Sequence, residues 1–66
     1  MFDVLDVTWK GVFRDEIGSE RIVTRVFTAS SREAVWETIQ GIVDAHKLKW
    51  GLTLMRETLT IERSER

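Results

Sequence analysis

The side chains that could carry chemistry are few in this chain, and the first to consider is its single histidine, His46. A histidine acts as a general base when a nucleophile or an orienting carboxylate lies within hydrogen-bonding reach. Asp44 is close in sequence, but residues two apart lie on different sides of a helix. We therefore interpret His46 as a histidine at a helix end or at the edge of the core.

Acidic side chains gather near the N-terminus, where the chain carries Asp3, Asp6, Asp15, Glu16 and Glu20. Paired carboxylates can act as acid and base when one of them is buried, but these positions fall at strand starts and in a turn. One histidine and scattered carboxylates do not supply the clustered ligands of a metal site. No glycine-rich loop follows a strand, so a phosphate cradle is not expected either. We expect no catalytic residue, no metal and no cofactor, and hence no enzyme.

Two arginines and an aromatic residue share one face of a predicted strand: Arg21, Arg25 and Phe27. Basic residues interleaved with an aromatic side chain on an open sheet can bind single-stranded nucleic acid by stacking. The same residues, together with Val12 and Val23, also resemble a protein interface, with an apolar centre and arginines at its edge. The net charge of -1 and the pI of about 5.7 disfavour nucleic acid. We therefore predict that these five residues bind a partner protein. The less favoured alternative is nucleic-acid binding through Arg21, Arg25 and the basic residues of the third strand.

A long helix is predicted over residues 30–51. Ser30 followed by Glu33 fits a capping box, in which the two side chains satisfy free backbone N–H groups of the first turn. Gly51 is a typical left-handed helix end. The apolar stripe, at the helical period of 3.6 residues, consists of Val35, Ile39, Ile42 and His46, widened by Trp36 and Val43.

Two strands are predicted before the helix, over residues 2–14 and 21–29, joined by a polar turn. In the first, apolar and polar residues alternate with the period of a half-buried strand. The second has apolar residues on both faces. Pairing Phe13 with Ile22 would place Ile22 and Val26 under the helix, with Val23 and Phe27 on the opposite face. A slip of one residue would exchange these two sets.

The third predicted strand, residues 52–63, changes its apolar face part-way along. Leu52 and Leu54 lie on one face, and Met55, Leu59 and Ile61 lie on the other. A β-bulge near Arg56 and Glu57 would explain the change. Alternatively, the second half of the strand packs on a partner chain, which makes Met55, Leu59 and Ile61 the predicted dimer contacts.

These elements predict one α+β domain over residues 1–66 with the order β-β-α-β. We expect a three-stranded, mainly antiparallel sheet in the order 2-1-3 with the helix on one face. The alternative places the third strand parallel to the second through a right-handed crossover. A chain of this size buries only about 60% of its unfolded surface. Because it has no cysteine for a disulfide, oligomerisation is the expected source of further stability, and we favour a homodimer.

The junction Val26-Phe27-Thr28-Ala29-Ser30-Ser31-Arg32-Glu33-Ala34 resembles one that recurs in small bacteriophage-encoded proteins. Some anti-CRISPR and other anti-defence proteins are similar in length and share the β-β-α-β order. The resemblance covers the junction and the layout and carries no functional residue over. It implies a viral or mobile-element accessory protein that acts as an inhibitor, binding and blocking a host component, often as a dimer.

The sequence thus favours a non-enzymatic protein-binding module that blocks an unidentified host protein. We expect it in the cytoplasm, that of the host if a phage encodes it. No apolar run is long enough to span a bilayer, and Asp3 and Asp6 stand where a signal peptide carries basic residues. A further alternative is sequestration of a small molecule in a cleft between subunits. The partner, the biological process and the oligomer geometry stay open.

Overall fold

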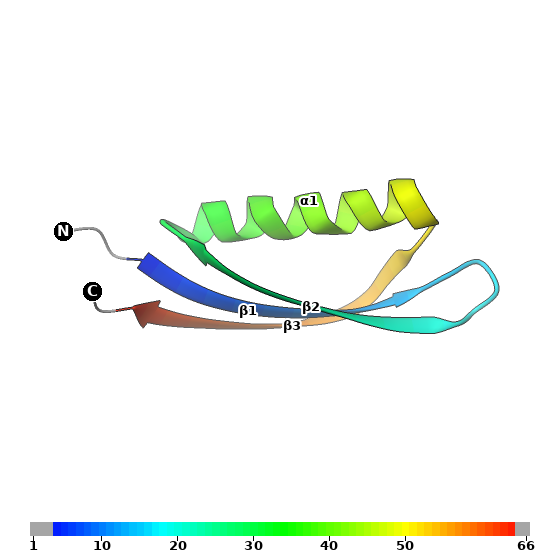
Figure 1. The fold of residues 1–66 in the computed structure, drawn as a ribbon, viewed down its shortest axis with the longest axis horizontal. Helices are drawn as coiled ribbons and strands as arrows, with labels where there is room; N and C mark the ends of the chain where they lie inside the picture. The colour runs from blue at the N-terminus through cyan, green and yellow to red at the C-terminus, as the bar shows by residue number, and fades with distance from the viewer. Residues whose placement is uncertain (1–3, 65–66) are drawn as a thin grey trace.

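The computed structural model describes residues 4–64, which form three strands and one helix. Strand β1 (Val4–Arg14) is followed by β2 (Glu20–Ala29), the helix α1 (Arg32–Trp50) and β3 (Thr53–Ser64). The sheet order is β2-β1-β3 with both pairs antiparallel, which confirms the predicted α+β architecture and rules out the parallel alternative. The helix covers one face of the sheet and leaves the other uncovered (Figure 1).

The helix begins one residue later than the capping-box prediction places it. Ser31, not Ser30, is the N-cap, and its hydroxyl oxygen accepts a hydrogen bond from the Ala34 N–H at 3.1 Å. Glu33 therefore lies in the first turn, where its negative charge interacts favourably with the positive end of the helix dipole. At the other end Gly51 adopts the predicted left-handed conformation, with φ 65° and ψ 27°.

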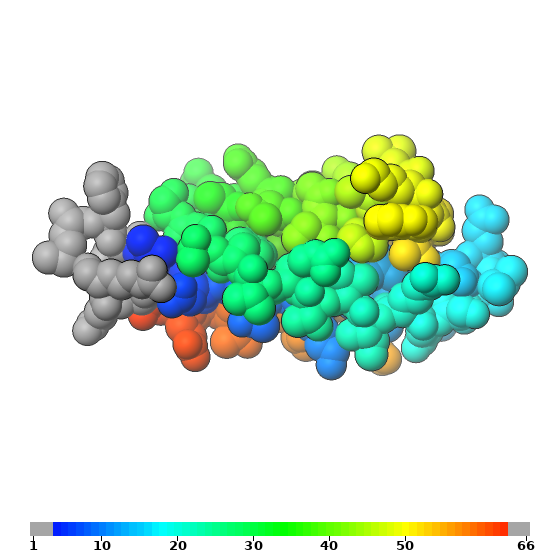
Figure 2. Space-filling model, in the orientation of Figure 1, coloured from blue at the N-terminus to red at the C-terminus, as the bar shows by residue number. Residues whose placement is uncertain are grey.

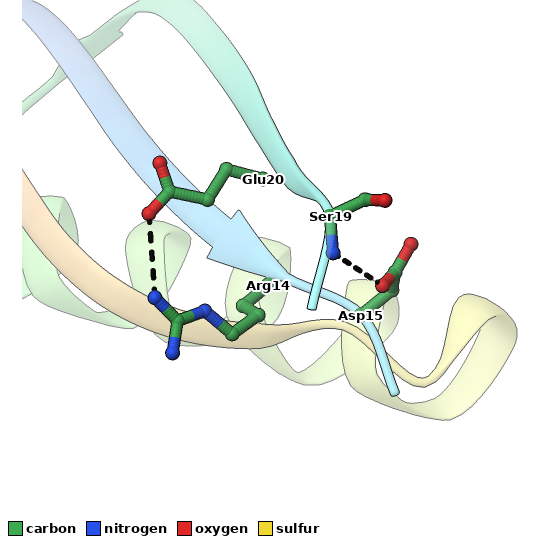
Figure 3. A network of polar contacts seen from close by, with 4 residues as sticks. All are labelled: Arg14, Asp15, Ser19 and Glu20. Atoms are coloured by element: carbon green, nitrogen blue, oxygen red, sulfur yellow. Dashed lines mark hydrogen bonds and ion pairs between the residues drawn. The ribbon is translucent and has the colours of Figure 1, made fainter. Parts of the chain in front are cut away.

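The turn between β1 and β2 is held by Asp15. Its carboxylate accepts hydrogen bonds from the backbone N–H groups of Ile17, at 3.1 Å, and Ser19, at 2.9 Å. The Asp15 N–H donates to the Ser19 carbonyl at 3.0 Å, and Gly18 supplies the positive φ that the turn requires. Figure 3 shows this turn beside the ion pair of Arg14 and Glu20, whose charged groups are 3.5 Å apart.

This turn sets a register one residue away from the pairing of Phe13 with Ile22. Phe13 faces Arg21, and Trp9 faces Arg25. The slipped register therefore holds, and Val23 and Phe27 pack against the core under the helix. Ile22 and Val26 lie on the opposite, uncovered face. The physical reason is that this register buries the larger Phe27 ring, while long arginine side chains at the sheet edge still reach solvent.

The core lies between β1 and the helix. Its fully buried side chains, all with no exposed surface, are Val7, Trp9, Phe13 and Val35. Ile39 and Leu52 complete it, and His46 closes its end with 8% of its surface exposed. The predicted helix stripe is therefore confirmed at Val35, Ile39 and His46, while Trp36 is half exposed.

Gly11 is buried because the ring of Trp9 lies over it. A methyl group on Gly11 would be 2.5 Å from Cη2 and 2.7 Å from Cζ2 of Trp9, and 3.0 Å from Cδ1 of Leu54. Two residues along the strand, Phe13 meets Trp9 edge to face, with ring centroids 6.0 Å apart. The interruption of the apolar alternation at Gly11 thus makes room for the indole ring.

Strand β3 contains the bulge that would explain its change of face. Val12 faces Arg56 and Phe13 faces Leu54, so Met55 is the extra residue. The bulge lies one position before the predicted site at Arg56 and Glu57. It returns Leu59 and Ile61 to the face of Leu52 and Leu54, where they pack partly buried against the core. Only Met55, half exposed, stays outside. Met55, Leu59 and Ile61 therefore do not form one dimer surface.

Among residues 4–64, no helix is both long enough and apolar enough to cross a membrane.

We predict that Gly11→Ala lowers the free energy of unfolding by about 1–3 kcal/mol, because the added methyl overlaps a fully buried indole ring. Gly41→Ala is the matched control. That position is exposed within the helix and has free space around it, so alanine should raise the stability by up to about 1 kcal/mol. Urea denaturation measures both changes, and equal stabilities for the two variants would contradict the packing of Trp9 over Gly11.

Candidate protein-binding surface

The uncovered side of the sheet presents a broad surface, which we call the open face. Successive side chains of each strand point alternately to the helix side and to the open face, so every second residue of a strand belongs to the open face. By the pairing register, its members are Asp6, Thr8, Lys10, Val12 and Arg14 of β1, Glu20, Ile22, Thr24, Val26 and Thr28 of β2, and Thr53, Arg56, Thr58, Thr60 and Glu62 of β3.

The centre of the open face combines apolar side chains with positive charge. Val12 stands between Ile22 of β2 and Arg56 of β3, and in the next row Lys10 stands between two threonines. Ile22 is 64% exposed and Val26 is 75% exposed. An open depression of about 290 Å³ lies here, lined by Lys10, Val12, Ile22, Arg56, Glu57 and Thr58.

Charge is distributed unevenly along the open face. At the hairpin end Arg14 is paired with Glu20, the one ion pair among the described residues. At the other end Asp6 faces Glu62 across the strands. Lys10 and Arg56 in the middle have no such partner within residues 4–64. The depression is lined by these two cations and one carboxylate, Glu57, so the centre is locally positive although the whole chain carries a net charge of -1.

The five predicted partner-binding residues do not come together. Val12 lies on the open face, whereas Arg21, Val23, Arg25 and Phe27 lie on the helix side of β2. Val23 and Phe27 are partly buried against the core, and the two arginines are exposed at its margin. The expected single patch was wrong because it depended on the other hairpin register.

The nucleic-acid alternative loses its stacking platform for the same reason. The Phe27 ring packs against the core, so it cannot receive a base. The basic residues also diverge: Arg21 and Arg25 lie on the helix side of β2, Arg63 lies on the helix side of β3, and Arg56 is on the open face.

His46 lies at the end of the core, as the interpretation from sequence expects. Its Nδ1–H donates to the Ile42 carbonyl, 2.7 Å away, because a carbonyl oxygen can only accept. Its ring stacks on Phe13 with centroids 4.9 Å apart and meets Trp50 at 5.1 Å. The His46 ring therefore has a packing role at the end of the core.

The acidic residues do not converge on a site either. Asp15 is engaged by the turn, Glu20 pairs with Arg14, and Asp6 lies at the far end of the sheet. Asp3 lies outside the described residues. Within residues 4–64, no three histidine, aspartate or glutamate side chains are grouped as metal ligands.

Sequence reasoning did not place Ile22, Val26 and Arg56 together on one uncovered surface. A signal was present, because Ile22-Val23-Thr24-Arg25-Val26 carries apolar and polar residues at both parities. Period-two patterning identifies the two sets but not which of them the helix covers.

The chain matches no protein-family model, no curated protein and no solved structure. Its function must therefore be argued from the open face itself.

The assignment of neighbouring residues to opposite faces can be tested by truncation. We predict that Phe27→Ala lowers the free energy of unfolding by about 2 kcal/mol because the ring packs on the core. Val26→Ala should cost less than about 0.5 kcal/mol because its side chain is mostly exposed. Urea denaturation at one protein concentration, low enough to keep the chain monomeric, measures both, and the reverse order of costs would indicate the other register.

Proposed function

We propose that this protein is a non-enzymatic binding module whose open face receives a partner protein. The observation that carries the proposal is the uncovered centre of the sheet, where exposed apolar side chains adjoin two cations without ion-pair partners among the described residues. Contiguous apolar surface with arginine and polar groups around it is characteristic of protein interfaces. The titratable residues His46 and Asp15 have structural partners, which favours binding over catalysis.

Charge complementarity specifies the partner's chemistry. Lys10 and Arg56 flank the apolar depression, so the complementary surface has an apolar ridge bordered by aspartate or glutamate side chains. Threonine hydroxyls of the neighbouring rows (Thr8, Thr24, Thr58 and Thr60) can donate and accept hydrogen bonds at the rim. A flat, open surface of this kind suits a folded protein better than a small ligand, which binds in a deeper cleft.

The resemblance to small phage-encoded proteins extends the proposal to a biological role. In that role the partner is a component of a bacterial defence system, and binding occludes it. This role rests on the similarity of the junction at residues 26–34 and of the β-β-α-β order, and it requires no catalytic group.

Partner capture tests the proposal with two matched charge reversals on β3. Arg56→Glu changes the centre of the open face, and Arg63→Glu makes the same change on the helix side of the same strand. Both side chains are exposed, so neither change should unfold the chain. We expect a specifically captured protein to bind Arg56→Glu at least tenfold more weakly than wild type, and Arg63→Glu nearly as well as wild type. Equal retention by both variants would show that the open face is not the binding surface.

The biological role is tested separately in infected bacteria. Cells that carry individual defence systems would express the wild-type protein or Arg56→Glu, and phage plaques would be counted. We expect the wild type to restore plaques against at least one system and Arg56→Glu to fail. If the wild type restores none across a broad panel, the anti-defence role is rejected, while the capture experiment still judges protein binding.

A further inference from the structure

Strand β2 forms an edge of the sheet with its outer hydrogen-bonding groups facing away from β1. In an antiparallel pair, residues alternate between bonding to the neighbour and facing away. The Asp15 N–H bonds to the Ser19 carbonyl, so the alternation turns the N–H and C=O of Ile22, Thr24 and Val26 outward. One contact agrees with this: the Arg25 guanidinium donates to the Thr24 carbonyl at 3.1 Å. Figure 2 shows β2, cyan to green, running across the front of the molecule with nothing over it.

The two edges of the sheet differ in how they are protected. Natural edge strands avoid pairing with other chains through bulges, charges and prolines. Strand β3 has a bulge at Met55 and, beyond it, four charged residues: Arg56, Glu57, Glu62 and Arg63. Strand β2 carries Glu20, Arg21 and Arg25, but it pairs with β1 without a register shift, contains no glycine or proline, and is uncharged at residues 22–24 and 26–29. The β2 edge is therefore the one open to pairing.

The molecule is more elongated and exposes more surface than is typical of a domain of its length. The chain extends over 48 × 17 × 12 Å, and its radius of gyration is 13.4 Å, against about 11 Å for a compact domain of this length. Its accessible surface is 5113 Å², whereas a monomer of 7.7 kDa typically exposes about 4,300 Å². The excess, about 800 Å², equals the area that each partner buries in a standard protein interface.

We propose that a second copy of this chain pairs with β2 in antiparallel orientation around a two-fold axis at Thr24. The axis is perpendicular to the sheet, so both helices lie on one side and the two sheets join into one of six strands. Ile22 then faces Val26 of the second copy, and Thr24 faces Thr24. The outward N–H and C=O groups of these residues bond across the axis. The Arg25 guanidinium leaves the Thr24 carbonyl, and the Thr24 N–H of the second copy takes its place.

Charge selects this register. Two residues that face each other across the joined strands must have their side chains on the same side of the sheet. Alternative registers of the two β2 strands therefore differ from this one by steps of two residues. A shift in one direction places Arg21 opposite Arg25, and a shift in the other places Arg25 opposite its own copy. Like charges directly opposite each other destabilise a strand pair. With the axis at Thr24, Arg25 faces Val23 and Arg21 faces Phe27, so no two like charges lie directly opposite each other.

The proposed dimer leaves enough room for both helices, and it brings the open faces of the two copies side by side. The two β1 strands would lie about 14 Å apart, three strand spacings, and a helix with its side chains is about 10–12 Å wide. Ile22 of each copy and Val26 of the other would form two apolar pairs on the open face, with the pair of Thr24 side chains between them. This inference rests on the β2 edge and stands independently of whether the open face binds a partner.

The first test is the solution mass by light scattering, across a concentration series of the full chain. We expect twice 7.7 kDa at micromolar or higher concentration. Val26→Lys should raise the dissociation constant at least tenfold, because it places a charge beside Ile22 of the second copy. Thr58→Lys, on the open face of β3, should leave the constant unchanged. A mass of 7.7 kDa at every concentration overturns the proposal.

The second test fixes the geometry by disulfide trapping, since the chain has no cysteine of its own. Facing residues in a bonded antiparallel pair have Cα atoms about 5.5 Å apart, which suits a disulfide. Thr24→Cys should therefore form a covalent dimer on mild oxidation. Thr28→Cys should not, because it faces Glu20 and its own copy lies roughly 27 Å away. Thr60→Cys, at the β3 edge, should also stay uncoupled. Trapping through Thr60→Cys, equal trapping by Thr24→Cys and Thr28→Cys, or a dimer that Thr24→Cys does not trap overturns the proposed pairing.

These outcomes can be separated from failure of the proposed function. A wild-type dimer whose open face captures no protein leaves the β2 pairing in place and rejects the binding module. A monomer that captures a partner through Arg56 does the reverse.

Discussion

The indole ring of Trp9 lies across the backbone of Gly11, and the packing of the helix against the sheet depends on this contact. With the ring flat along β1, Phe13 can meet it edge to face, and His46 can stack on Phe13. The aromatic series therefore connects the middle of the sheet to the last turns of the helix. Any side chain at Gly11 would lift the ring and separate the two layers, because close-packed interiors have little free space to absorb such a shift.

The same packing carries a cost at its centre. The Nε1–H of Trp9 is buried and has no hydrogen-bond partner among the described residues, which costs about 1–3 kcal/mol. Indole rings bury a large apolar area, and burial of the whole Trp9 ring offsets that cost. In so small a domain the core is limited to one helix and mainly one strand, so a single ring has a large share of the total stability.

A single helix can cover only one face of a three-stranded sheet, and the surfaces of this protein follow from that limit. The helix takes the Trp9 face and leaves the opposite face exposed, with Ile22 and Val26 in solvent. It also leaves both sheet edges uncovered, and of the two edge strands only β3 carries a bulge. The two proposals occupy these two remaining surfaces. The open face is the candidate for a partner protein, and the β2 edge is the candidate for a second copy of the chain.

The sequence by itself determined the element order, the helix stripe and the helix end at Gly51, because these depend on local periodicity and backbone preference. It also predicted the sheet order, and it left a bulge in β3 as one of two explanations for the change of apolar face. It did not determine which residues of β2 lie under the helix. Ile22 and Val26 are as apolar as Val23, and a slip of one residue exchanges the two sets. Only the closure of the turn by Asp15 and the packing of Phe27 against the core decide between them. The candidate site was mispredicted for this reason, since the surface of a sheet follows from its register, and the register follows from contacts between residues distant in sequence.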